Sequence, residues 1–129
     1  MTPRAVLLPR NATGSSLPPI DAFGDGGFRI AGVRKEGPTL IVDGAARPWS
    51  LKGETLGLDD LKLFIDRPDR PDMLVLGMGE RLIHPPAQVR QAFREAGIGL
   101  EVMDTATACR TYNLLAGEGR NIAAALLPV

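Results

Sequence analysis

Residues 98–127, IGLEVMDTATACRTYNLLAGEGRNIAAALL, are the stretch of sequence that decides the fold. An apolar run at 98–103 predicts a strand, and Asp104 directly after it is a residue type typical of a helix N-cap. The following residues keep helical spacing as far as the glycines around Glu118, and 121–127 form a second apolar run. This order of strand, helix and strand predicts a right-handed crossover between two parallel strands.

Another strand and helix precede this stretch. Residues 73–76 form a compact apolar run that ends in Gly-Met-Gly, which is typical of a strand covered on both faces. Residues 86–97 predict the clearest helix of the chain, with Pro86 at its first position and Gly97 just beyond its end. Its apolar residues recur at helical spacing, at Val89, Ala92, Phe93 and Ala96. The second half of the chain therefore predicts the order β-α-β-α-β.

The first third of the chain has an antiparallel pattern. Phe28 lies in a short alternating stretch between glycines, and 39–42 is a second apolar run. Asp43-Gly44 is a strong signal for a hairpin turn, so 47–51 is the expected partner strand.

The remaining segments complete the predicted organisation. Residues 55–65 have helical spacing, and the prolines of 66–72 end that helix. Residues 1–19 are rich in proline, serine and arginine and predict a poorly ordered tail. We therefore expect a single α/β domain over residues 20–129, with helices packed on a sheet and a β-rich N-terminal part.

The composition excludes several classes of function. Lysine plus arginine and aspartate plus glutamate both number 15, so no net charge attracts nucleic acid. One cysteine and one histidine cannot form a four-ligand zinc site, and no nucleotide-binding glycine motif is present. No apolar stretch approaches the ~20 residues of a transmembrane helix. We expect no metal, no cofactor, no nucleic-acid partner and a cytoplasmic location.

Cys109 is the residue most open to a catalytic interpretation. A helical wheel places it on one arc with the apolar residues Ala108, Tyr112, Leu115 and Ala116. That position predicts a buried thiol that packs in the core, because free cysteine is among the most buried residue types. The alternative is a nucleophile paired with His84, the only histidine. Asn113 lies between the two sides of the helix and is expected to bond a nearby backbone group.

The turn at Gly77 and Gly79, together with the helix start at Asp104 and Thr105, forms a candidate ligand site. Each segment follows a strand, and α/β domains bind ligands at the carboxyl ends of their parallel strands. Free backbone N–H groups at such a helix start can hold an anion. The alternative is a tight turn plus a helix cap, because the Asp104 carboxylate would occupy those N–H groups and repel phosphate.

The polar side of the same helix is a candidate interaction surface. Thr107, Arg110 and Thr111 surround Leu114, an apolar residue on the side that should face water, and Arg120 follows the helix. Arginine is enriched in protein interfaces, so this group resembles the edge of one. The alternative is a second contact within the domain, with the β-rich opening.

Several segments resemble a known family. They are AFGDGGFRIAG at 22–32, the single Trp49, LVLGMG at 74–79, the His-Pro-Pro turn at 84–86, and GIGLEVMDTATACRTYNLLAGEGRNIAAALLP at 97–128. The chain is similar to the family of small domains of unknown function that includes mitochondrial respiratory complex I assembly factor 3 and bacterial and archaeal relatives. This resemblance implies a three-layer α/β fold with a central mixed sheet whose last strand runs antiparallel.

The resemblance also implies a function. The mitochondrial member implies help in assembling NADH:ubiquinone oxidoreductase at a membrane through protein contacts, whereas the bacterial relatives have no agreed reaction. We expect no import presequence in this chain, which would be a departure from the mitochondrial pattern, and Met78 is a second departure because the family commonly has threonine there. The lost hydroxyl weakens a chemical role for that turn.

Two hypotheses follow. The first is a non-enzymatic protein-interaction factor without catalytic residues, which assists assembly of a respiratory complex and lies at the membrane only through its partners. The alternative is a small-molecule or anion-binding domain, or an enzyme, with its site between the Gly77–Gly79 turn and the helix starting at Thr105. In that case Arg110 and Arg120 would lie near the ligand.

Overall fold

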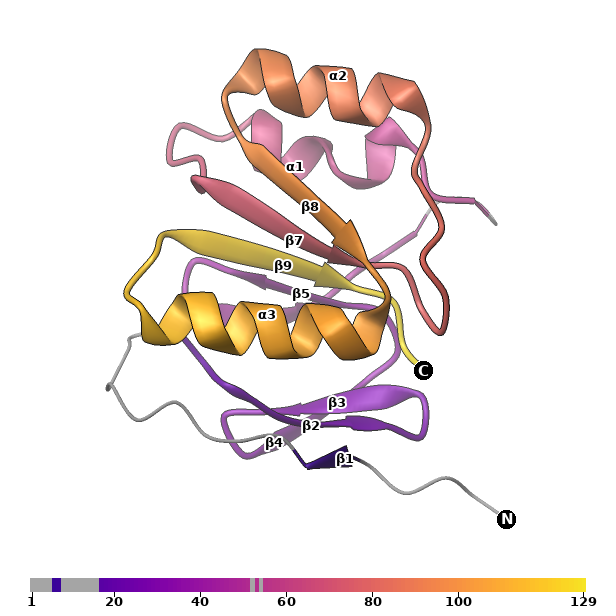
Figure 1. Ribbon diagram of the computed structural model, residues 1–129, viewed down its shortest axis with the longest axis vertical. Helices are drawn as coiled ribbons and strands as arrows, with labels where there is room; N and C mark the ends of the chain where they lie inside the picture. The colour runs from indigo at the N-terminus through magenta and orange to yellow at the C-terminus, as the bar shows by residue number, and fades with distance from the viewer. Residues whose placement is uncertain (1–5, 8–16, 52, 54) are drawn as a thin grey trace.

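A five-stranded and a four-stranded β-sheet form the framework of the protein in a computed structural model, which describes residues 6–7, 17–51, 53 and 55–129 (Figure 1). The large sheet has the order β6-β5-β9-β7-β8, with β5 Thr39–Val42, β6 Ala45–Pro48, β7 Met73–Gly77, β8 Gly99–Met103 and β9 Ile122–Leu126. The small sheet has the order β1-β2-β3-β4, with β1 Val6–Leu7, β2 Ile20–Gly24, β3 Gly27–Ile30 and β4 Val33–Glu36. The predicted tail falls mainly on residues 1–5 and 8–16, which lie outside the described residues.

The large sheet is mixed, as predicted, and β9 joins its two parts. β9 is parallel to β7 on one side and antiparallel to β5 on the other, while β7 and β8 are parallel. The last strand is therefore antiparallel to its neighbour β5, as the resemblance implies, and parallel to its other neighbour β7. The reason is the crossover through the last helix, which returns the chain in the direction of β7 and β8.

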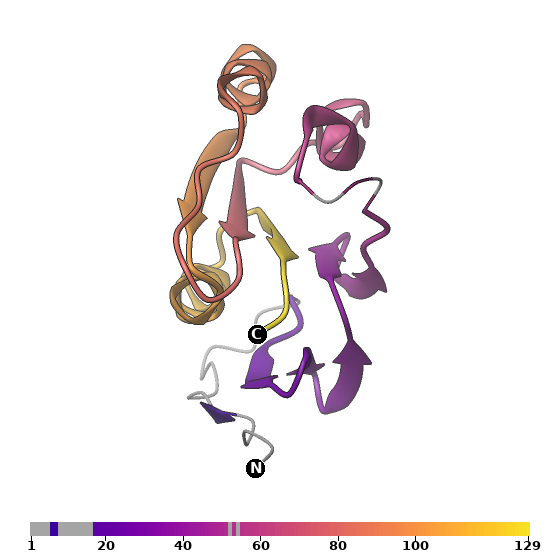
Figure 2. The ribbon, with the colours of Figure 1, turned by 90° about the vertical axis from the view of Figure 1, so that its right-hand side faces the viewer.

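Two helical layers cover the large sheet on opposite faces (Figure 2). The short helix α1 (Lys62–Ile65) and α2 (Ala87–Ala96) share a core with Leu74, Leu76 and Ala125. The long helix α3 (Thr105–Gly117) and the small sheet share the other core with Val75, Ala124 and Leu126. Because alternate residues of each strand point to opposite faces, the apolar runs of β7 and β9 are buried on both sides.

The helix ends follow local sequence signals with two exceptions. Gly97 ends α2 in a left-handed conformation with φ 74°, as its position predicts, but Pro86 is the N-cap residue and not the first helical residue. The predicted helix at 55–65 is divided into a 3₁₀ turn, Leu58–Asp60, and α1. The division has a visible cause, since the indole N–H of Trp49 bonds the Asp60 carbonyl at 3.0 Å while the Phe64 N–H bonds the Leu61 carbonyl.

Candidate functional site

The polar side of α3 lies in solvent. Thr107, Arg110 and Leu114 are exposed, Thr111 is half-buried, and 63% of Leu114 is accessible. Arg120 is also exposed and follows the end of α3. The helix thus brings Thr107, Arg110, Thr111 and Leu114 together on one surface, with Arg110 and Leu114 one turn apart. We call these four residues the α3 face.

Asn113 and Tyr112 fix how α3 is rotated. The Asn113 Oδ1 atom accepts the Ile20 N–H at 2.9 Å, and its Nδ2 atom donates to the Ile20 carbonyl at 2.8 Å. The Tyr112 hydroxyl donates to the Pro18 carbonyl at 2.8 Å. The prediction that Asn113 bonds a backbone group is confirmed. The contact with the β-rich opening is made by these residues, so the adjacent Leu114 is directed away from it.

The Gly77–Gly79 turn is bonded directly to the start of α3. The Thr105 hydroxyl accepts the Gly79 N–H at 2.8 Å and donates to the Leu127 carbonyl at 2.7 Å, and the Thr105 N–H bonds the Gly79 carbonyl. A Cβ on Gly77 would lie 3.0 Å from the Thr105 hydroxyl and 3.1 Å from the Ala108 Cβ. The structure therefore brings Gly77, Gly79 and Thr105 together, with protein atoms packed between them. A ligand at this position would have to displace these contacts.

Asp104 serves as the N-cap of α3. Its carboxylate accepts the Thr107 N–H at 2.8 Å and the Thr107 hydroxyl at 2.9 Å. These two hydrogen bonds hold the pKa of Asp104 below its usual range. The resulting negative charge occupies the helix N-terminus, where an anion would otherwise bind.

Cys109 is fully buried and does not meet His84. It belongs to the core on the α3 side of the large sheet, while His84 lines a cavity with Met78 on the α2 side. Burial raises the pKa of Cys109 from 9.0 to about 12, so the thiol stays protonated at neutral pH. These surroundings match the predicted role of Cys109 as a packed core residue.

We expect Cys109 to resist alkylation in the folded protein and the free energy of unfolding to fall above pH 9. Below 9.0, the thiol is protonated in both folded and unfolded chains. Between 9.0 and about 12 only the unfolded chain loses the proton, so stability falls by about 1.4 kcal/mol per pH unit for this group. The pKa of Tyr112 is also raised by burial, which adds to the loss above 10.0.

Mass spectrometry after iodoacetamide treatment, and urea unfolding from about pH 7 to about pH 11, measure the two effects. Labelling in urea is the control for thiol reactivity. Rapid stoichiometric labelling of the folded protein at pH 7 would contradict the assignment of Cys109 to the core.

The structure contains a cavity beside the loop after β7 that we did not predict from the sequence. The cavity has a volume of about 420 Å³ and lies where β7 and β9 end; it is lined by Thr55, Leu56, Met78, Ile83, His84, Pro85, Pro86 and Leu127. Two sequence features could have indicated it, namely the carboxyl ends of parallel strands and the adjacent apolar residues Leu82 and Ile83 in a loop. The sequence alone could not predict that Leu56 and Leu127 line the same cavity.

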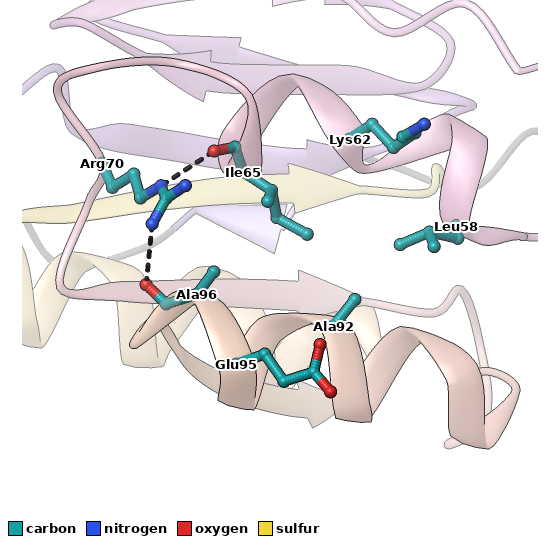
Figure 3. A pocket seen from close by; sticks show the side chains of 7 residues that line it. All are labelled: Leu58, Lys62, Ile65, Arg70, Ala92, Glu95 and Ala96. Carbon is teal, nitrogen blue, oxygen red and sulfur yellow. Dashed lines mark hydrogen bonds between the residues drawn. The ribbon is translucent and has the colours of Figure 1, made fainter.

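A second hollow lies between α1 and α2 (Figure 3). Arg70 closes one end, because its guanidinium donates to the Ile65 carbonyl at 2.8 Å and to the Ala96 carbonyl at 3.2 Å. These carbonyls belong to the last residues of the two helices, where a positive charge is favourable. Arg70 therefore has a structural role here, joining two helix ends.

Within the described residues, no group of three or more histidine, cysteine, aspartate or glutamate side chains is placed to hold a metal ion. Nor does any helix in that part of the chain have the length and apolar character needed to cross a membrane.

These features define an α/β domain in which a mixed sheet lies between a pair of helices on one face and a helix plus a small antiparallel sheet on the other. The chain belongs to the protein family of unknown function DUF498/DUF598, whose profile matches residues 20–127.

Relatives and solved structures cover most of the chain. An uncharacterised protein of Rhodobacter capsulatus is 39% identical over 95% of this chain and 94% of its own length. Human NADH dehydrogenase [ubiquinone] 1 alpha subcomplex assembly factor 3 is 36% identical over 97% of this chain and 67% of its own length. The crystal structure of an outer membrane protein from Bartonella henselae superposes with a TM-score of 0.79 at 32% identity, covering 88% of this chain and 96% of that one.

Proposed function

We propose that this protein is a non-enzymatic interaction factor that assists assembly of respiratory complex I, and that it binds its partners through the α3 face. The observation that carries the proposal is the exposed Leu114 beside Arg110 on a helix of fixed orientation. The human relative, an assembly factor of NADH dehydrogenase, indicates the kind of partner. Those partners are respiratory subunits or other assembly proteins.

The α3 face is suited to binding because it needs little ordering. Asp104 caps the N-terminus of the helix, Thr105 bonds it to the end of the large sheet, and Asn113 bonds it to the small sheet. A rigid surface loses less conformational entropy on association than a mobile one. Leu114 then supplies apolar area and Arg110 a charge of the type enriched in interfaces.

Chemical catalysis has weaker support. The Cys109 thiol is buried and has a raised pKa, while the polar groups of the Gly77–Gly79 turn and Thr105 bond one another. Binding of a small molecule or anion between these two segments, the second candidate, requires breaking those bonds. We also propose that the protein is cytoplasmic and that it reaches the membrane only through its partners.

Leu114→Glu is expected to abolish recovery of respiratory subunits in pull-downs from detergent-solubilised membranes. The substitution places a charge at the centre of an apolar contact, and its effect on the melting temperature should be small because the side chain is 63% exposed. Mass spectrometry of the recovered proteins is the measurement.

Val33→Glu is the matched control, since Val33 is 54% exposed on the small sheet and gains the same charge. It should retain the partners. Equal recovery with the wild type and Leu114→Glu, or recovery of abundant soluble proteins alone with the wild type, would refute the proposal.

A further inference from the structure

The cavity at the end of β7 and β9 is separate from the α3 face. Met78 directly follows β7 and Leu127 directly follows β9, and the two parallel strands end at the same edge of the sheet. The neighbouring crevice between the ends of β7 and β8 is closed by the bonds between Gly79 and Thr105. The open space therefore lies on the α2 side, at the edge where α/β sheets bind ligands.

Most of the cavity wall is apolar. Met78 and Leu127 line it at the ends of β7 and β9, Leu56 also lines it, and Pro85 and Pro86 restrict the backbone of the lining. Its volume of about 420 Å³ is within the range of small-molecule sites. Ile83 lines the cavity while 58% exposed, and its neighbour Leu82 is 51% exposed. An occupant that covers Ile83 would thus remove apolar surface from water.

Two of the lining residues, Thr55 and His84, have polar side chains, and the hydrogen bond of His84 determines which of its ring atoms can donate. An Arg90 guanidinium N–H lies 2.9 Å from the His84 Nδ1 atom. Arginine can only donate, so Nδ1 is the acceptor and the proton of the neutral ring is on Nε2. The neutral His84 ring thus has its N–H donor at Nε2, while its Nδ1 atom is hydrogen-bonded to the positively charged Arg90 guanidinium.

We propose that this cavity binds a small monocarboxylate with an apolar chain, with the chain against Met78 and Leu127 and the carboxylate accepting the His84 Nε2–H. A hydrogen bond to a charged acceptor is stronger than one to a neutral acceptor, and the Arg90 charge adds to the preference for an anion. The site takes no part in the proposed function, because it uses none of the α3 face residues.

Isothermal titration calorimetry with hexanoate and octanoate, together with backbone amide NMR, tests this proposal. Both acids should bind saturably, and affinity should rise by about fourfold for each added CH₂ group. The largest chemical-shift changes should lie at Met78, Ile83, His84 and Leu127. Octanol, which has the chain without the charge, should bind at least tenfold more weakly than octanoate.

His84→Ala separates the carboxylate contact from the apolar contact. We expect it to weaken octanoate at least tenfold and to change octanol affinity by less than twofold. His84 is exposed, so the variant should keep the wild-type melting temperature. Leu114→Ala, on the opposite side of the sheet, is the matched control and should bind octanoate as the wild type does.

Absence of saturable binding at millimolar octanoate, equal affinity for octanoate and octanol, or an unchanged affinity in His84→Ala would each overturn the proposal. Shift changes centred on α3 would overturn it as well. None of these results bears on the pull-down with Leu114→Glu, so the two proposals can fail separately.

Discussion

Asn113→Leu is expected to lower the free energy of unfolding by roughly 2–6 kcal/mol, because it leaves two buried backbone groups of Ile20 without partners. The Asn113 carboxamide bonds both the N–H and the carbonyl of Ile20, as a residue of a neighbouring strand would. Leucine has the same branching at Cγ but neither donor nor acceptor, so the loss reports the hydrogen bonds more than the shape.

Urea unfolding followed by circular dichroism measures this loss, and an unchanged m-value would show that the unfolded state is the same. Leu114→Ala, next in the chain but exposed, should change stability by less than about 0.5 kcal/mol. A change for Asn113→Leu no larger than this control would show that water or other groups satisfy Ile20.

Thr105→Val is expected to lower the free energy of unfolding by roughly 2–4 kcal/mol, the second largest effect that we expect. Valine keeps the branched shape but removes the hydroxyl that accepts the Gly79 N–H and donates to the Leu127 carbonyl. The Gly79 N–H lies in a buried contact, so the lost partner is not readily replaced by water.

Thr105→Ser is the matched comparison, since it keeps the hydroxyl and loses only a methyl group, at a cost of about 1 kcal/mol. Urea unfolding of both variants gives the difference. Hydrogen exchange adds a local measurement, because the Gly79 amide should exchange faster in Thr105→Val and not in Thr105→Ser. If serine proves as costly as valine, packing and not hydrogen bonding joins the turn to α3.

Sequence was sufficient where the residues of one element decide its structure. The helical wheel predicted the buried side of α3, with Cys109 and Tyr112 in the core and Leu114 in solvent, and the structure confirms it. The Asp43-Gly44 hairpin was predicted for a similar reason, since both residues have positive φ and few residue types accept that conformation.

Features that depend on contacts between residues far apart in the chain could not be predicted from the sequence. The partner of Asn113 is 93 residues away in the chain, and its identity depends on how the small sheet packs against α3. The break before α1 depends on the indole of Trp49, which no local pattern connects to Asp60. The cavity beside His84 has the same origin, because its walls come from three separate segments of the chain.

The position of β9 has a consequence for biosynthesis. Every other strand precedes β9 in the chain, yet β9 lies between β5 and β7 and supplies the pairing that joins the two parts of the large sheet. While the ribosome is still translating earlier codons, the β5–β6 hairpin and the β7–α2–β8 unit have no strand in common, and the apolar edges of β5 and β7 stay uncovered. The large sheet can therefore be completed only after β9 has emerged from the ribosome, and nascent chains stalled before Ile122 should be clients of chaperones that bind exposed apolar segments.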